Sequence, residues 1–125
     1  MSEKRSVVLD SDDVKPEKVD RGEKIWIQRL ITDSEGANNC FMRMFTLKPG
    51  ASMPLHRHED TDHVQYILDG KMKVKLGNKT KVVEEGDVLY ISSGLLHSYE
   101  NPYEEKMKFI CIVPAGEIHT EIKGE

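Results

Sequence analysis

Five histidines occur in this 125-residue chain, and four of them fall into two clusters. The first cluster contains His56 and His58, separated by one residue, and His63 five residues further on, while His97 belongs to the second cluster. Alternate side chains of a β-strand share one face, so His56 and His58 are expected to point together toward the interior. Imidazole nitrogens that gather in this way are ligands for a divalent transition-metal ion.

Packing is the alternative explanation for these histidines, but a buried neutral imidazole needs a partner at both ring nitrogens, and a metal ion supplies one of them. For His63 a second possibility is open: an extra residue after His58 tilts its ring away and leaves three ligands and a water molecule. We expect His119 to be a solvated surface residue. Glu59, Asp60 and Asp62 are expected to form a mostly solvated acidic loop, in which a carboxylate could accept a hydrogen bond from a ligand histidine.

Short runs of strand-forming residues separated by turn residues make up the rest of the chain, which is the all-β pattern. Eight runs are expected as strands: 24–30, 40–47, 64–68, 71–76, 79–83, 88–91, 97–100 and 107–113. We expect the second of these to stop at Pro49-Gly50, and Asp69-Gly70 to form a tight hairpin turn. No helix longer than a turn or two is expected, and the pattern fits a sandwich, a jelly roll or a barrel.

Composition limits the possible classes of function. Residues 1–20 are polar and are interpreted as an arm, followed by a single domain over 21–125. The net charge of −4 argues against a nucleic-acid partner, and no apolar run approaches the ~20 residues that cross a bilayer. Cys40 and Cys111 lack metal-site spacing and are expected to be free thiols, which together with the absence of an export signal favours the cytoplasm. No arrangement for nucleophilic hydrolysis appears.

The two histidine clusters resemble the two sequence motifs of the cupin superfamily. Two glycines and two histidines match the first motif at its spacing: Gly50, His56, His58 and Gly70. Two glycines, a histidine and an asparagine match the second motif: Gly86, Gly94, His97 and Asn101. Two positions depart from the usual pattern, because His63 stands in place of a glutamate and Ser92 in place of a proline. In having four histidines the chain resembles a subset of small single-domain cupins.

This resemblance implies a cupin double-stranded β-helix, a jelly-roll barrel, with one divalent metal ion held by His56, His58, His63 and His97. Manganese, iron, copper, nickel, cobalt and zinc all remain possible. The resemblance also implies a homodimer, for which strand 24–30 is a candidate edge that a partner strand could cover.

A substrate pocket is expected beside the metal ion. Gln65 and Tyr99 each lie two residues beyond a predicted ligand and should face the same interior, and Phe109 and Cys111 alternate on one wall. Arg43 is a candidate carboxylate anchor if it points inward and an ordinary surface charge if it points outward. The function expected from the resemblance is a metal-dependent, dioxygenase-like oxidoreductase acting on a small organic substrate. A non-catalytic module that binds a small molecule or a metal is the alternative, and an isomerase is a third possibility.

Overall fold

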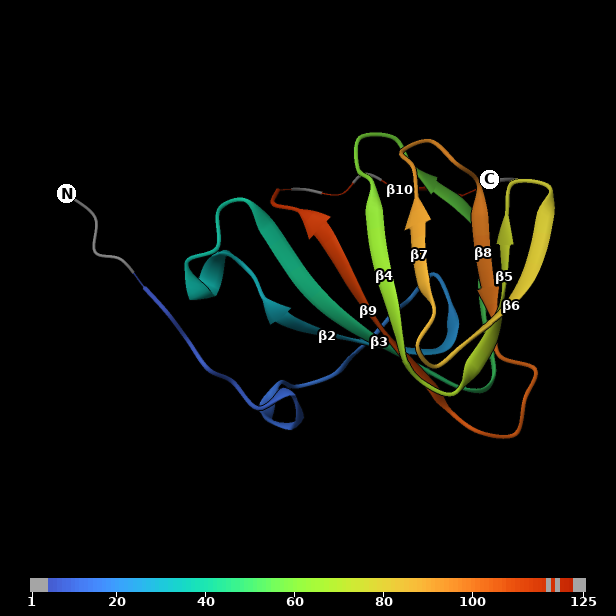
Figure 1. The fold of residues 1–125 in the computed structure, drawn as a ribbon, viewed down its shortest axis with the longest axis horizontal. Helices are drawn as coiled ribbons and strands as arrows, with labels where there is room; N and C mark the ends of the chain where they lie inside the picture. The colour runs from blue at the N-terminus through green and yellow to red at the C-terminus, as the bar shows by residue number, and fades with distance from the viewer. Residues whose placement is uncertain (1–4, 117, 119, 123–125) are drawn as a thin grey trace.

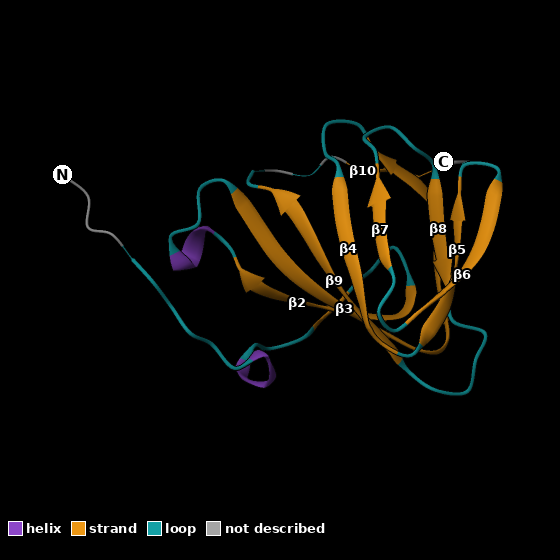
Figure 2. Cartoon of the chain, viewed as in Figure 1, coloured by secondary structure: helices purple, strands orange, loops and turns teal. Residues whose placement is uncertain are grey.

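The computed structural model describes residues 5–116, 118 and 120–122, and in this part of the chain nearly all regular structure is β-strand (Figures 1 and 2). The strands are β1 (Glu17–Lys18), β2 (Glu23–Ile31), β3 (Cys40–His58), β4 (His63–Asp69), β5 (Lys71–Leu76), β6 (Lys79–Glu84), β7 (Val88–Ile91), β8 (His97–Glu100), β9 (Met107–Pro114) and β10 (Thr120–Ile122). Two single turns of 3-10 helix, Ser11–Asp13 and Asp33–Glu35, accompany them. The expected all-β class is confirmed.

A single curled antiparallel sheet forms the domain. Its strands follow the order β6-β5-β8-β3-β9-β4-β7, and β2 and β10 are added along β3. The sheet bends around on itself, so that β4 and β7 lie opposite β5 and β6 across the interior (Figure 1). Neighbours in space therefore come from distant parts of the sequence, which is the jelly-roll arrangement.

The prediction that this strand stops at Pro49-Gly50 was wrong, because β3 continues through both residues. The strand continues to His58 and changes its partner at this corner, from β9 along Cys40–Leu47 to β8 from Ser52 onward. Gly50 makes the bend with φ +85°, a conformation that L side chains rarely adopt. Its N–H donates to the carbonyl oxygen of Asn101 at 2.8 Å, which ties the corner to the end of β8. The bend delivers His56 and His58 to the interior.

The tight hairpin predicted at Asp69-Gly70 is absent, because β4 and β5 do not pair with each other. Instead the chain crosses there from the β9–β4–β7 side of the sheet to the β8–β5–β6 side. Gly70 has φ +74°, and a Cβ atom at this position would lie 2.7 Å from the carbonyl oxygen of Lys106. A close backbone crossing, and not hairpin geometry, therefore requires glycine here. By contrast, Gly77-Asn78 does connect the paired strands β5 and β6.

The amino-terminal segment runs away from the barrel in its first described residues (Figure 1). Its later part joins the sheet, because Glu17 and Lys18 pair with Ile27 and Trp26 of β2. Val19 follows and is buried in the core. The division at residue 20 stays a prediction, and the structure adds that the end of the arm is anchored to the domain.

The core lies inside the curl, and strand alternation selects which side chains enter it. Along β9 each second residue is buried, which places Met107, Phe109, Cys111 and Val113 inside. In β4 the same alternation buries His63, Gln65 and Ile67. Polar side chains thus occupy inward positions at the end of the interior where the histidines lie. No helix in the described part of the chain has the length and apolar character needed to span a membrane.

Candidate metal centre

Three histidines converge inside the barrel. The side chains of His56, His58 and His97 each offer a nitrogen atom, and these atoms all lie within 4.8 Å of one another. His56 of β3 is directly opposite His97 of β8 in the strand register, while His58 follows two residues along the same face of β3. All three are buried, with no more than 4% of their surface exposed. Two motifs about forty residues apart in the sequence thus meet at one point.

Hydrogen bonds orient each of these rings. Nδ1 of His56 lies 2.7 Å from the carbonyl oxygen of Pro54, and Nδ1 of His97 lies 2.9 Å from that of Leu95. A carbonyl oxygen only accepts, so both Nδ1 atoms carry the proton and donate it. Nδ1 of His58 lies 3.1 Å from the hydroxyl oxygen of Thr120 on β10. The Nε2 atoms of His56 and His97 are left as free ligand nitrogens, which is how proteins prepare imidazoles for a metal ion.

The site fits a divalent metal ion on chemical grounds. Nε2 of His97 is fully buried and has no hydrogen-bond partner among the described residues, an arrangement that costs free energy unless a ligand satisfies it. The cavity beside the rings has a volume of about 20 Å³, enough for an ion or about one water molecule. Neutral imidazoles suit zinc, copper, iron and nickel.

The histidines are held in the neutral form that binds metals. Burial is the main cause that lowers the pKa of His56 to about 4, and the neighbouring His97 is the second cause. Burial likewise lowers the pKa of His58 to about 2, with His63 as the next cause. The pKa of His63 falls to about 3 through burial and the charge of Arg43. A buried cluster without a carboxylate resists protonation, since each proton would add a charge beside the others.

His63 lies next to the cluster of three but outside it. Its ring stacks on that of His58, with centroids 4.3 Å apart and 11° between the planes. Nδ1 of His63 is 3.4 Å from the sulfur of Cys111, and Nε2 is 3.4 Å from the hydroxyl oxygen of Thr61. The structure therefore brings three of the four predicted ligands together. The fourth, His63, packs against His58 outside the cluster.

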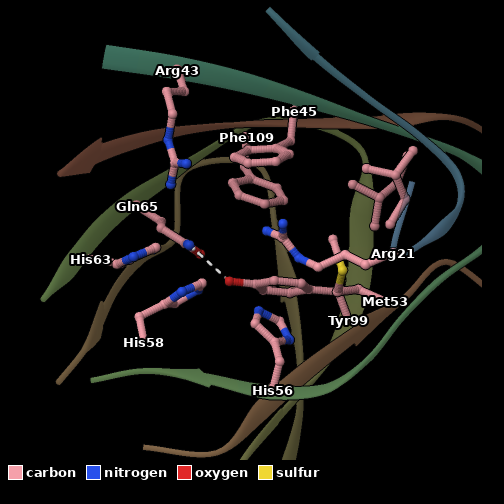
Figure 3. Close-up of a pocket in the computed structure, with 12 residues that line it drawn as sticks. Arg21, Arg43, Phe45, Met53, His56, His58, His63, Gln65, Tyr99 and Phe109 are labelled. Carbon is pink, nitrogen blue, oxygen red and sulfur yellow. Dashed lines mark hydrogen bonds between the residues drawn. The ribbon is translucent and has the colours of Figure 1, made fainter. Parts of the chain in front are cut away.

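The residues predicted to line a substrate pocket surround the same cavity. Arg43, Gln65, Tyr99 and Phe109 line it, together with His56, His58 and His63 (Figure 3). Gln65 donates from Nε2 to the hydroxyl oxygen of Tyr99 at 2.8 Å. Arg43 points inward, which settles the question that the sequence left open. Cys111 lies behind this layer, where its sulfur accepts from Nη2 of Arg43 at 3.4 Å.

Arg21 was missed by sequence reasoning. Its guanidinium group reaches into the cavity beside Tyr99, although the residue as a whole is exposed (Figure 3). Burial of that group lowers the pKa of Arg21, and the nearby charge of Arg43 lowers it further. Arg21 follows the polar arm directly, and a single arginine at such a boundary belongs to no recognisable sequence motif. Its position next to Gly22, just before a strand, was the one local feature that could have drawn attention to it.

The acidic loop does not orient the ligand histidines in the described part of the chain. Glu59 pairs with Arg57 at 2.9 Å, and Asp62 accepts from the backbone N–H of Ser93 at 2.8 Å. The Nδ1 atoms of the three rings instead lie beside two backbone carbonyls and a threonine hydroxyl. Cys40 and Cys111 are free thiols, as expected. His119 lies outside the described residues.

A curled antiparallel sheet that encloses a cluster of buried histidines defines a small jelly-roll protein with a candidate metal centre. The model of the cupin domain matches residues 43–113, which is more than half of the chain and includes every histidine of the cavity. The chain belongs to the cupin family.

Individual relatives cover the chain to different extents. The chain is 30% identical over 118 residues to the oxalate-binding protein of Thermotoga maritima, covering 90% of this chain and 98% of that protein. It is 38% identical over 50 residues to quercetin 2,3-dioxygenase of Bacillus subtilis, which covers 40% of this chain and only 15% of the enzyme. The structure of polyketide cyclase RemF from Streptomyces resistomycificus superposes with a TM-score of 0.90 at 24% identity, over 96% of this chain and 87% of that one. This last similarity concerns the fold alone.

Proposed function

We propose that this cupin holds one divalent transition-metal ion and uses the centre to bind a small anionic organic molecule. The observation that carries the proposal is the buried Nε2 atom of His97, which has no partner among the described residues and faces two further histidines. His56, His58 and His97 would hold the ion, and His63 would join them as a fourth ligand after a small rotation of its ring. When bound, such an ion supplies a Lewis acid that attracts oxygen donors.

The residues around the ion favour an anion as the ligand. Four neutral imidazoles would leave the ion's charge of +2 uncompensated, and Arg43 and Arg21 add positive charge to the same cavity. The name of the Thermotoga maritima relative, an oxalate-binding protein similar along nearly its whole length, supports a small carboxylate. Gln65 would keep the hydroxyl group of Tyr99 in place at the cavity wall.

A dioxygenase-like oxidoreductase is the second candidate. The similarity to quercetin 2,3-dioxygenase includes the motif region, and a metal ion with open positions can bring an organic substrate and dioxygen together. An isomerase stays the third and weakest possibility. In either reaction the chain's own contribution would be to orient the substrate and to exclude water from the buried cavity.

Calorimetric titration of metal-loaded and metal-free protein with oxalate tests the first candidate. Saturable binding that requires the metal is the expected result, and equal or absent binding in both forms would contradict the proposal. Oxygen uptake with catecholic and enolisable compounds separates the second candidate: consumption tied to one compound would make the chain an enzyme.

A homodimer belongs to the same proposal. β1 and Val19 cover the outer edge of β2 from Ile25 to Ile27, and beyond Ile27 no described strand pairs with this edge, which leaves it open to a partner strand. Exposed apolar side chains on neighbouring strands β4 and β7 add to the surface that a partner would cover: Val64, Tyr66, Val88 and Tyr90. Sedimentation equilibrium should give twice the chain mass, and a single chain mass at all concentrations would contradict the homodimer.

The free thiols support a reducing compartment such as the cytoplasm.

A further inference from the structure

Two arginines reach the histidine cavity without a carboxylate to balance them. The ion pairs of the described residues involve Arg29 and Arg57, whereas Arg21 and Arg43 form none. Arg43 is only 8% exposed, and its Nε atom has no hydrogen-bond partner there. Burying a guanidinium group in this way costs free energy unless an anion pairs with it. Such a group in a core is explained when a bound ligand supplies that anion.

The guanidinium group of Arg43 is held in place from two sides. Its Nη2 atom donates to the sulfur of Cys111 at 3.4 Å, and its central carbon lies 5.2 Å from the ring centroid of Phe45. Phe45 in turn stacks on Phe109, with centroids 5.0 Å apart. Neither contact neutralises the charge, but together they fix the plane of the guanidinium group. A fixed planar group of this kind is suited to a carboxylate.

Arg21 is positioned by a short turn that seats against β3. The N–H of Val19 donates to the carbonyl oxygen of Ile25 at 3.0 Å, and the N–H of Gly22 donates to that of Val19 at 3.2 Å. A Cβ atom on Gly22 would lie 2.9 Å from Cδ1 of Ile25 and 3.1 Å from the carbonyl oxygen of Ser52. The turn is thus packed closely against β2 and β3, and the Arg21 side chain lies over the cavity (Figure 3).

The two arginines also line a larger groove outside the cavity. The inner cavity measures about 20 Å³, whereas the groove that shares Arg21 and Arg43 measures about 490 Å³. Of the groove's other charged side chains, Arg29 is paired with Glu17 at 3.0 Å and Asp33 contributes a carboxylate. Arg21 and Arg43 therefore line both the histidine cavity and the groove, and a ligand that extended from one into the other would contact them.

We propose that the centre takes an organic acid longer than oxalate, with oxygen atoms at one end directed toward the histidines and a further carboxylate held by Arg43 and Arg21. This deepens the proposed function and rests on it. Arg43 would donate hydrogen bonds to this carboxylate from the buried side, through its fixed guanidinium group. Arg21 would donate to the same carboxylate from the more exposed side. Oxalate, with two carbon atoms, would meet the ion with both carboxylates and leave none for the arginine pair.

Matched keto acids test the proposal by calorimetric titration of metal-loaded protein. 2-Oxoglutarate and 2-oxopentanoate have five carbons and the same keto acid end, and only the former has a second carboxylate. We expect 2-oxoglutarate to bind about ten- to hundredfold more tightly, the range for a charge-assisted hydrogen bond, and more tightly than oxalate. Equal binding of the two keto acids, or tighter binding of oxalate, would overturn the proposal.

Arg43→Met and Arg21→Met should each remove most of the preference for 2-oxoglutarate while leaving the metal content unchanged. Lys81→Met, which removes an exposed charge from β6, should keep the preference. The melting temperature of ligand-free Arg43→Met should equal or exceed that of the parent chain, because an unpaired buried charge is lost. A lower melting temperature with an unchanged preference would show a structural role and contradict the proposal. Absence of metal from the parent chain would instead contradict the proposed function.

Discussion

The ring of His63 lies flat against that of His58, with centroids 4.3 Å apart, while its two nitrogens face Cys111 and Thr61. This position makes His63 a neighbour of the three-histidine cluster and not yet a member of it. The contact of Nε2 with the hydroxyl oxygen of Thr61 is long, at 3.4 Å, so that the cost of giving it up is small. A bound ion would provide the stronger partner.

Substituting single histidines separates the three clustered ligands from the fourth. His63→Gln should lower the affinity for zinc about tenfold and keep one ion per chain. His97→Gln should abolish stoichiometric binding, because it removes one of the three clustered nitrogens. Competition with a chromogenic chelator measures both. An unchanged affinity in His63→Gln would mean that the ring only packs beside the site.

Thr120 should influence the metal ion although it does not touch it. Its hydroxyl group lies 3.1 Å from Nδ1 of His58 and fixes that ring from β10. Losing such a partner of a metal ligand costs about ten- to hundredfold in affinity, so Thr120→Val should weaken zinc binding by that factor. The control is Glu121→Gln, on the same strand, which pairs with Arg57 at the surface and should leave the affinity unchanged.

Acid should destabilise the metal-free protein between about pH 6.5 and pH 4. An unfolded histidine titrates near pH 6.5, whereas burial lowers the pKa of His56 to about 4 in the folded chain. Over this window the unfolded state binds more protons, so the free energy of unfolding decreases as the pH falls and is greatest above pH 6.5. Urea titrations from pH 7.5 to 4.5 measure the trend. His56→Gln should make the slope less steep, because His58 and His63 still contribute to it, and an equal slope in this variant would contradict the assignment.

Gly70 and Gly86 form a matched pair for testing the crossing between β4 and β5. Both have positive φ, but a Cβ atom on Gly70 would lie 2.7 Å from a backbone oxygen, whereas one on Gly86 would meet nothing within 4 Å. Gly86→Ala should therefore lose about 1 kcal/mol from its backbone conformation alone, and Gly70→Ala at least about 2 kcal/mol more from the clash. Chemical denaturation compares them, and equal losses would refute the crossing.

Much of the fold could be predicted from the sequence because each strand has a local signature. Alternation in β4 and β9 correctly indicated which side chains are buried, including Gln65 and Phe109. The fixed spacing of the two motifs likewise placed His56, His58 and His97 on one interior face. These features depend on periodicity along single strands, which a sequence displays directly.

Other features depend on contacts between distant segments and had no local signal. β3 passes through Pro49-Gly50 because the end of β8 binds that corner, and Gly70 crosses between the two sides of the sheet instead of closing a hairpin. Thr120 reaches His58 only because β10 pairs with β3. The position of Arg21 over the cavity similarly depends on a turn packed against Ser52. None of these pairings can be read from one stretch of residues.

The central claim is that one divalent ion binds among the Nε2 atoms of His56, His58 and His97. Anomalous diffraction from crystals of the zinc-loaded protein, together with elemental analysis, tests it most directly. We expect one zinc ion per chain and an anomalous peak about 2 Å from each of these three nitrogens. Zinc bound elsewhere with no peak in the cavity, or protein that takes up no zinc at all, would contradict it.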